Sequence, residues 1–159
     1  MLYLKTSVNP GVFSIFKQKG YLHMKALIDT NVILDVLCSR KSFVKFSSIV
    51  WKYCEVSRIK GYISELPVPD IVYILRKELT PEKTKQVIDT LFLIFNVADL
   101  RVSDLKKAGA MKSGDYEDAL QMICAERIRA DYIVTRNTSD FAGSRVPVIT
   151  PYELVGKLR

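Results

Sequence analysis

The segment KALIDTNVILDVL, residues 25–37, contains both kinds of element from which the fold is built. Lys25–Ile28 ends in three apolar residues, as a short buried strand does. Asp29 follows directly, and NVILDVL then has the apolar spacing of a helix with Asn31 near its cap. A strand that passes at once into a helix begins a βα unit, so this segment indicates an α/β fold.

The same alternation continues to the end of the chain. Further strands are expected at 61–64, 96–100, 131–135 and 146–150, with helices at 42–60, 69–79, 80–95, 103–112, 115–130 and 151–159. Thr80 and Ser103 are the expected N-caps of two of these helices. Strands separated by helices predict a three-layer α/β fold, with a central, mainly parallel sheet flanked by helices and right-handed crossovers.

Length and composition narrow the class of protein. The 159 residues are enough for one domain, which we expect at 24–159, with 1–23 as an N-terminal extension outside it. No apolar run is long enough for a membrane span, and the first residues lack the pattern of a signal peptide. Three cysteines without C-x-x-C spacing are typical of buried thiols in a reducing compartment, so we expect a cytoplasmic protein.

The charged residues point to a polyanionic partner and to carboxylate chemistry. The net charge is +7, from 24 Lys and Arg against 17 acids, which favours nucleic acid or an acidic protein as a partner. His23 is the only histidine and precedes the first credible strand, which argues against a Ser-His-Asp site or a His/Cys zinc site. If the chain is an enzyme, carboxylates do the work, and their oxygens suit Mg²⁺ or Mn²⁺.

Polar residues gather where the predicted strands end. Ligand sites in parallel α/β sheets form beyond the carboxyl ends of the strands. Four separate segments deliver acids there, in company with Asn137: Asp29, Asp70, the i, i+3 pair Asp115 and Asp118, and Asp140. We therefore expect these acids to hold a cation.

A simpler interpretation applies to some of these acids taken alone. Acids in first helical turns are favoured by the helix dipole, by about 0.3–1 kcal/mol each. Asp70 and Asp115 fit that explanation. It does not account for Asp29, because an unpaired charge beside apolar residues costs free energy of folding, which indicates a functional reason for this acid. We expect Asp35 on the surface, and Glu117, Glu126 and Asp131 as solvated or turn residues.

Four motifs, in order and spacing, resemble those of the PIN domain family, and within it the VapC-like toxins of toxin–antitoxin pairs. LIDTNVILD resembles the first motif, with Asp29 as the leading acid, and SELPVPDIVYILRK the second, with Asp70 where Glu is usual. DYEDALQ resembles the third, with Asp118 as the main acid and Asp115 as an accessory one. IVTRNTSDF resembles the fourth, which contributes Thr135, Asn137 and Asp140.

The resemblance implies an Mg²⁺- or Mn²⁺-dependent endoribonuclease that hydrolyses RNA phosphodiester bonds. Asp29 and Asp118 would then bind the metal directly, and Asp70, Asp115 and Asp140 would bind it directly, through water or as accessory acids. Thr135 and Asn137 would position the attacking water or a phosphate oxygen. Basic side chains around the acids, Arg136 among them, would contact the RNA backbone. A cognate antitoxin and a homodimer are the expected protein partners.

Two other interpretations remain open from the residues. A metal- or nucleic-acid-binding module without turnover is compatible with Asp in place of Glu at position 70. A flavodoxin-like regulatory domain with an acidic Mg²⁺ pocket is the other, but it calls for Lys after a late strand, where this chain has only Arg136. Metal-dependent cleavage of RNA distinguishes the enzyme from both.

Overall fold

The structure is a computed structural model that describes residues 24–111 and 115–158. The extension expected at residues 1–23 lies outside the described residues and stays a prediction. In the described part of the chain, no helix is both long and apolar enough to cross a membrane.

The core of the fold is a five-stranded parallel sheet. Its strands are β1 (Lys25–Ile28), β2 (Lys60–Ser64), β3 (Asn96–Ala98), β4 (Tyr132–Val134) and β5 (Val148–Ile149). They lie in the order β3-β2-β1-β4-β5, and all four neighbouring pairs are parallel. The predicted parallel α/β sheet is thus confirmed. Because the chain runs outward from β1 to β3 on one side and returns to β4 on the other, the order reverses between β1 and β4.

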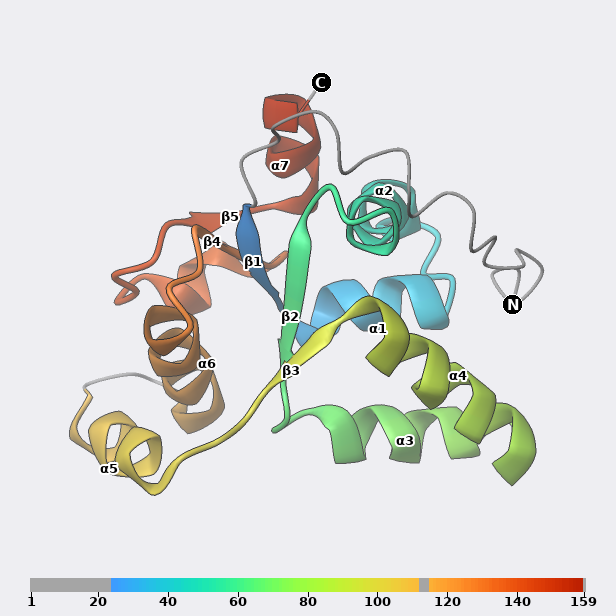
Figure 1. Cartoon of the computed structure of the whole chain (residues 1–159), viewed down its shortest axis with the longest axis horizontal. Helices are drawn as coiled ribbons and strands as arrows, with labels where there is room; N and C mark the ends of the chain where they lie inside the picture. The colour runs from blue at the N-terminus through green and yellow to red at the C-terminus, as the bar shows by residue number, and fades with distance from the viewer. Residues whose placement is uncertain (1–23, 112–114, 159) are drawn as a thin grey trace.

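Seven α-helices and one 3-10 helix accompany the strands in the described part of the chain, and all but α7, which follows β5, lie between strands (Figure 1). These helices are α1 (Thr30–Leu37), α2 (Val44–Glu55), α3 (Val68–Arg76), α4 (Pro81–Ile94), α5 (Val102–Ala110), α6 (Tyr116–Arg127), η4 (Thr138–Phe141) and α7 (Pro151–Leu158). Helix α4 begins as the sequence predicts: Thr80 caps it by accepting a hydrogen bond from the backbone N–H of Lys83 (3.4 Å). Asp115, expected in the first turn of its helix, is the N-cap residue of α6.

The side chains of β1, the central strand, point alternately to the two faces of the sheet. Helices cover both faces, so the fold has three layers: helices, sheet and helices. Ala26 and Ile28 pack into the cluster formed with α1, α2, α3, α4 and α7, whereas Leu27 packs with α6 and η4 on the opposite face. Helix α5 packs on α6, outside the sheet. Figure 1 shows α5 and α6 on one side of the strands and α1, α3 and α4 on the other. The predicted three-layer arrangement is confirmed.

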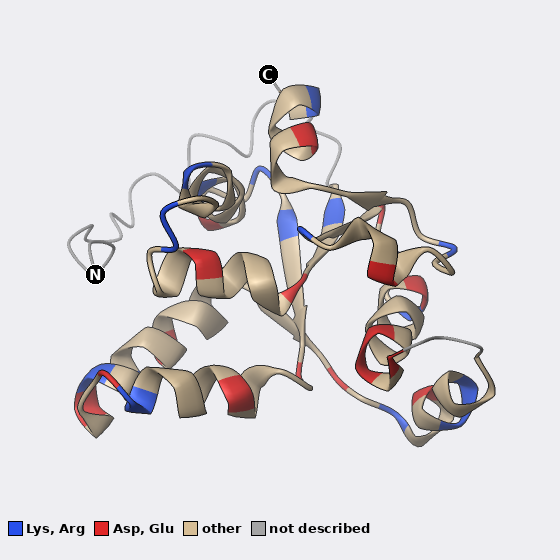
Figure 2. Cartoon of the chain, turned by 180° about the vertical axis from the view of Figure 1, so that it is seen from behind, with Lys and Arg blue, Asp and Glu red and all other residues tan. Residues whose placement is uncertain are grey.

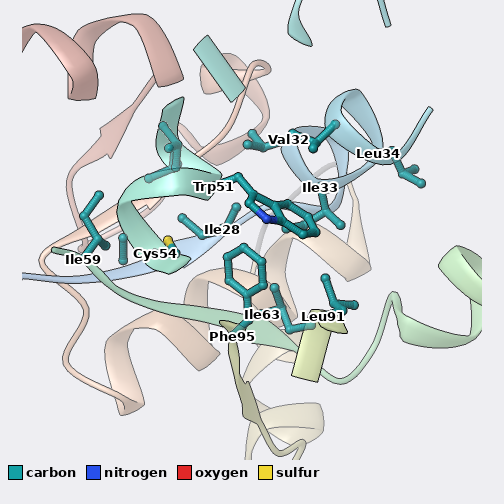
Figure 3. Packing of buried hydrophobic residues seen from close by; sticks show 14 of the residues in the cluster. Ile28, Val32, Ile33, Leu34, Trp51, Cys54, Ile59, Ile63, Leu91 and Phe95 are labelled. Atoms are coloured by element: carbon teal, nitrogen blue, oxygen red, sulfur yellow. The ribbon is translucent and has the colours of Figure 1, made fainter. Parts of the chain in front are cut away.

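The larger cluster holds the sheet and its helices together near β2. Figure 3 shows the indole of Trp51 on α2 against the ring of Phe95, with the Cys54 thiol close by. The two rings meet edge to face, with centroids 5.1 Å apart, a geometry worth about 0.5–1.5 kcal/mol beyond the buried area. Gly61 on β2 makes this packing possible, because a Cβ there would lie 2.7 Å from the Cys54 sulfur.

Two helix starts differ from the expected ones. Asp29 itself is the N-cap residue of α1, and Asn31 lies inside the first turn, where its side chain is free to bond elsewhere. Helix α5 begins after Arg101, and Ser103 is not its cap. The backbone N–H of Arg101 donates instead to the carboxylate of Asp104, three residues later in the chain (3.2 Å), and this bond stabilises the start of the helix.

Candidate functional site

The reversal of strand order places two polar residues side by side. Asp29 follows β1 and Thr135 follows β4, and these strands are paired in register through Ile28 and Val134. The backbone N–H of Asp29 donates to the carbonyl oxygen of Val134 (3.0 Å), which extends the ladder by one residue. Crevices outside strand ends at such reversals are where parallel α/β folds bind ligands. The sequence-predicted Asp29 and Thr135 therefore meet where a site is expected.

Asp29 is a buried carboxylate that accepts hydrogen bonds from neutral donors. Its side chain is part of a residue only 6% exposed. The Thr135 hydroxyl donates to Oδ2 (2.6 Å), the Gln121 amide donates to Oδ1 (3.4 Å), and the Asn31 amide donates to Oδ2 as well. Burial raises the pKa of Asp29, and the bonds from Thr135 and Gln121 oppose that rise. The hydrogen bonds orient this carboxylate, but none of them supplies a compensating charge.

Asn31 and Thr135 form a small network that fixes the turn after β4. The Asn31 amide donates to the Thr135 hydroxyl oxygen (3.0 Å), and its own carbonyl oxygen accepts from the backbone N–H of Arg136 (3.3 Å). The backbone N–H of Asn137 also donates to the Thr135 oxygen (3.0 Å). The backbone of Asn137 thus joins the network while the residue itself is exposed, and its role in positioning water or a phosphate oxygen stays a prediction.

The start of α6 brings further carboxylates to the site. Asp115 accepts hydrogen bonds from the backbone N–H groups of Glu117 (2.7 Å) and Asp118 (3.4 Å). Burial, together with the charges of Asp115, Asp29 and Asp140, raises the pKa of Asp118 to about 6. Like charges influence one another in this way only at short range, so these acids from three segments surround one region.

Asp70 and Asp140 lie at the edge of this group of acids. Glu117 also belongs to the group, although the sequence did not predict it there. Asp70 in the first turn of α3 and Asp140 on η4 are both exposed. Glu117, expected as a solvated residue, is half-buried, and burial together with Asp115, Asp70 and Asp29 raises its pKa. In Figure 2, acidic segments on α6, on η4 and after β1 lie around the same part of the molecule.

Two buried polar residues near the site were not identified from the sequence. Gln121 is 3% exposed and lies one turn after Asp118 on α6, so its i, i+3 spacing from that acid was the available signal. Asp35, expected on the surface, is fully buried on α1. Its burial is explained by Ser47, whose hydroxyl donates to it (3.0 Å), and by Arg136, whose Nε lies 3.1 Å from Oδ2.

The carboxylates gathered at this site are suitable ligands for a hard divalent cation, although they are not yet close enough together to form a metal site. Among residues 24–111 and 115–158, no three His, Cys, Asp or Glu side chains are already placed as a metal cluster. Yet within the described chain neither Asp29 nor Asp118 forms an ion pair with Lys or Arg. Buried and crowded carboxylates without a cationic partner are the oxygen donors that Mg²⁺ and Mn²⁺ prefer.

Comparison with protein families decides the relationship suggested by the four motifs. The sequence model of the PIN domain matches residues 25–139, which is most of the chain and includes every one of the gathered acids except Asp140. The chain belongs to the PIN domain family. Among curated proteins, no sequence matches this PIN domain.

Solved structures share the fold of this PIN domain at low sequence identity. A toxin–antitoxin complex from Klebsiella pneumoniae has a TM-score of 0.60 and 22% identity, covering 80% of this chain and 98% of the matched one. VapBC-1 from nontypeable Haemophilus influenzae has a TM-score of 0.60 and 15% identity over 81% and 99% of the two chains. VapBC2 from Rickettsia felis, bound to a promoter DNA fragment, has a TM-score of 0.59 and 14% identity over 80% and 98%.

Proposed function

We propose that this PIN domain is a metal-dependent endoribonuclease, the toxin of a type II toxin–antitoxin pair. The single observation that carries the proposal is that α6, which carries Asp118, reaches Asp29 at the reversal of strand order: Gln121, one turn after Asp118, donates to Oδ1 of Asp29 (3.4 Å). Asp29 is buried and forms no ion pair with the residues that the structure describes, and the pKa of Asp118 is raised to about 6 by burial and by the surrounding acids. A site with this much uncompensated negative charge favours a divalent cation.

Asp29 and Asp118 would hold the Mg²⁺ or Mn²⁺ ion, with Asp70, Asp115 and Asp140 around it. When bound, the metal supplies a water of lowered pKa and charge stabilisation at the attacked phosphate. Thr135 orients Asp29 through its 2.6 Å hydrogen bond to Oδ2, and leaves Oδ1 with only the longer bond from Gln121 (3.4 Å). Asn137 is exposed beside Thr135, where its amide is available to a phosphate oxygen or to the attacking water.

The charge of the whole chain favours RNA as the substrate. The excess of basic residues gives a net charge of +7, although the site itself is acidic. Such an arrangement attracts the flanking phosphates of a nucleic acid while a bound cation faces the phosphate to be cleaved. Binding of RNA should therefore weaken steeply with salt concentration.

The proposed protein partners follow from the structural neighbours. Those neighbours include a toxin–antitoxin complex and VapBC complexes, some of them bound to DNA. We infer a cognate antitoxin that neutralises the acidic site with a basic side chain, and a homodimeric toxin. Cys54 and Cys124 are free, buried thiols, as suits the cytoplasm in which such a pair would act.

The test is manganese-dependent cleavage of a generic RNA by the full chain, compared with Asp29→Asn and Asp131→Asn. Both aspartates flank central strands, but Asp131 lies before β4 and accepts a hydrogen bond from the backbone N–H of Lys25 (2.8 Å), away from the site. We expect cleavage by the wild type and by Asp131→Asn, and none by Asp29→Asn or with a chelator. Equal loss of RNA with both variants would mean a contaminating nuclease and would contradict the proposal.

A binding module with little turnover is the second candidate, favoured by Asp70. The PIN motif usually has Glu where this chain has the shorter Asp, and the described acids are not preassembled as a metal cluster. On that alternative, Mn²⁺ binds to the wild type but RNA stays intact. Restoration of cleavage by Asp70→Glu would then show that the missing methylene group limits catalysis.

A further inference from the structure

Arg136 is held in place from several sides. It lies in the middle of the fourth PIN motif, between Thr135 and Asn137. Its backbone N–H donates to the Asn31 side chain (3.3 Å), whereas its own side chain turns back toward α1 and α2. The Nε atom lies 3.1 Å from Oδ2 of Asp35, and the side chain is 21% exposed.

The environment of Asp35 explains why the Arg136 side chain stays there. Asp35 is fully buried, so without a cation its charge would be costly. Arg136 supplies the closer charge, since the Arg40 guanidinium lies 3.6 Å from Oδ1 and is twice as exposed. The contact with Arg136 is an ion pair rather than an aligned hydrogen bond, because Nε has no hydrogen-bond partner in the described chain.

A second contact restrains the guanidinium plane. Its central carbon lies 4.0 Å from the centre of the Phe43 ring, directly before α2. The planar guanidinium of Arg can stack on an aromatic ring while it pairs with a carboxylate, whereas Lys offers only a compact point charge. The side chain therefore links the turn after β4 to two helices on one face of the sheet.

Asn31 and Asp35 hold the same residue from one face of α1. They are four residues apart, so their side chains lie one above the other on the helix. Asn31 bonds the backbone of Arg136 and Asp35 pairs with its side chain. Asn31 also donates to Asp29 and Thr135, so any movement of this turn is transmitted to the buried carboxylate.

We propose that Arg136, fixed by the buried Asp35 and the Phe43 ring, is a positioning residue that sets the orientation of Asp29 and Thr135 rather than a contact for RNA phosphates. The inference rests on the proposed metal-dependent function. It changes the expectation from the sequence, in which Arg136 was one of several basic side chains for the RNA backbone. A side chain held by an ion pair and a stacking contact has lost the freedom that a phosphate contact requires.

The experiment compares Arg136→Lys, Arg136→Met, Asp35→Asn and the double variant Asp35→Asn/Arg136→Met with the wild type. Arg136→Lys keeps a positive charge near Asp35 but loses the planar stack. Arg58→Met is the matched control: its guanidinium lies 4.6 Å from the centre of the Tyr53 ring and bonds the Leu158 carbonyl, away from the site. Each protein is first checked for folding by thermal unfolding, and all later measurements are made well below the lowest Tm.

Two further measurements separate positioning from phosphate binding. The first is Mn²⁺ affinity by titration calorimetry on the protein alone, and the second is RNA cleavage, resolved into kcat and KM at several salt concentrations. We expect Mn²⁺ affinity and kcat to fall roughly 10–100-fold in both Arg136 variants, as is typical of residues that orient metal ligands. KM and its salt dependence should stay near those of the wild type. The double variant should lose little more than Arg136→Met, because the two residues act as a pair.

The contrary outcomes are distinct. A raised KM with a salt slope about one unit smaller, at unchanged Mn²⁺ affinity, would make Arg136 a phosphate contact and overturn the inference. A lowered Tm with unchanged Mn²⁺ affinity and kcat, as expected for Arg58→Met, would leave it only a structural role. If the wild type binds Mn²⁺ but cleaves no RNA, the proposed function fails, while a loss of Mn²⁺ affinity in the variants still supports the positioning role. A wild type that binds no Mn²⁺ overturns both.

Discussion

Replacement of Asp118 by Asn should stabilise the metal-free protein at neutral pH. The pKa of Asp118 is raised from 3.8 to about 6, first by burial and then by Asp115, Asp29 and Asp140. Between these two pH values the folded protein binds more protons than the unfolded chain, so stability falls as the pH rises from about 4 to 6. An asparagine side chain at this position carries no charge, and its contribution would not change across this window.

The magnitude follows from the two pKa values. A difference of this size corresponds to about 3 kcal/mol at pH 7. Asp118 is half-buried, and solvent screening reduces the gain to about 1–2 kcal/mol. For a protein of this length, that gain raises Tm by roughly 2–8 °C. At pH 4 the carboxyl is largely protonated in the folded protein and about half protonated in the unfolded chain, so Asp118→Asn and the wild type should be nearly equal.

The assay is thermal and urea unfolding of both proteins in chelator, at pH 4, 5, 6 and 7, and then with Mn²⁺ at pH 7. Asp89→Asn is the matched control, since Asp89 is an exposed acid that pairs with Lys85 on α4 (2.6 Å) and should cost at most about 0.5 kcal/mol. With Mn²⁺ at about 100 times its Kd, the wild type should gain about 2.7 kcal/mol and become the more stable protein. If Asp118→Asn is no more stable than the wild type at pH 7 in chelator, the reasoning from crowded carboxylates is refuted.

Three other substitutions test separate parts of the structure. Thr135→Val removes the hydroxyl that orients the buried carboxylate, and Mn²⁺ affinity measured by calorimetry should fall roughly 10–100-fold; the metal-free protein should lose about 1–3 kcal/mol, because Asn31 and the backbone N–H of Asn137 lose their acceptor. Gly61→Ala would place a Cβ 2.7 Å from the Cys54 sulfur, so urea unfolding should show a loss of about 1–3 kcal/mol; an unchanged stability would mean that the packing near β2 is looser than described. Arg127→Met leaves the buried Asp104 without its 3.0 Å partner and should cost about 3–5 kcal/mol, which Asp104→Asn in the same protein should partly restore.

The fold could be predicted from the sequence because its signals are local. Each strand is a short apolar run at a turn, and each helix has its own apolar spacing, so the order of elements specifies a parallel sheet without knowledge of distant contacts. The cap of α4 at Thr80 is equally local. The start of α5 was wrong because Asp104, rather than Ser103, bonds the free backbone N–H.

The site was predictable in outline but not in its supporting residues. Asp29 and Thr135 could be placed at the carboxyl edge of the sheet because each follows a predicted strand, whereas their direct contact depends on the pairing of β1 with β4. The burial of Asp35 could not be deduced, because its partner Arg136 is brought to it only by the pairing of β1 with β4. Glu117 was missed because its burial depends on how α6 packs on the sheet, whereas Gln121 had one signal that was not used, its i, i+3 spacing from Asp118.

The central claim is that the separate acids converge on one divalent cation. Crystals of the full chain grown with Mn²⁺ would test it directly, through the anomalous scattering of the metal. We predict one strong anomalous peak between the carboxylates of Asp29 and Asp118, absent from Asp29→Asn crystals grown in the same way. A wild-type map with no peak beside Asp29 at saturating Mn²⁺, or with the metal bound elsewhere on the chain, would contradict the account.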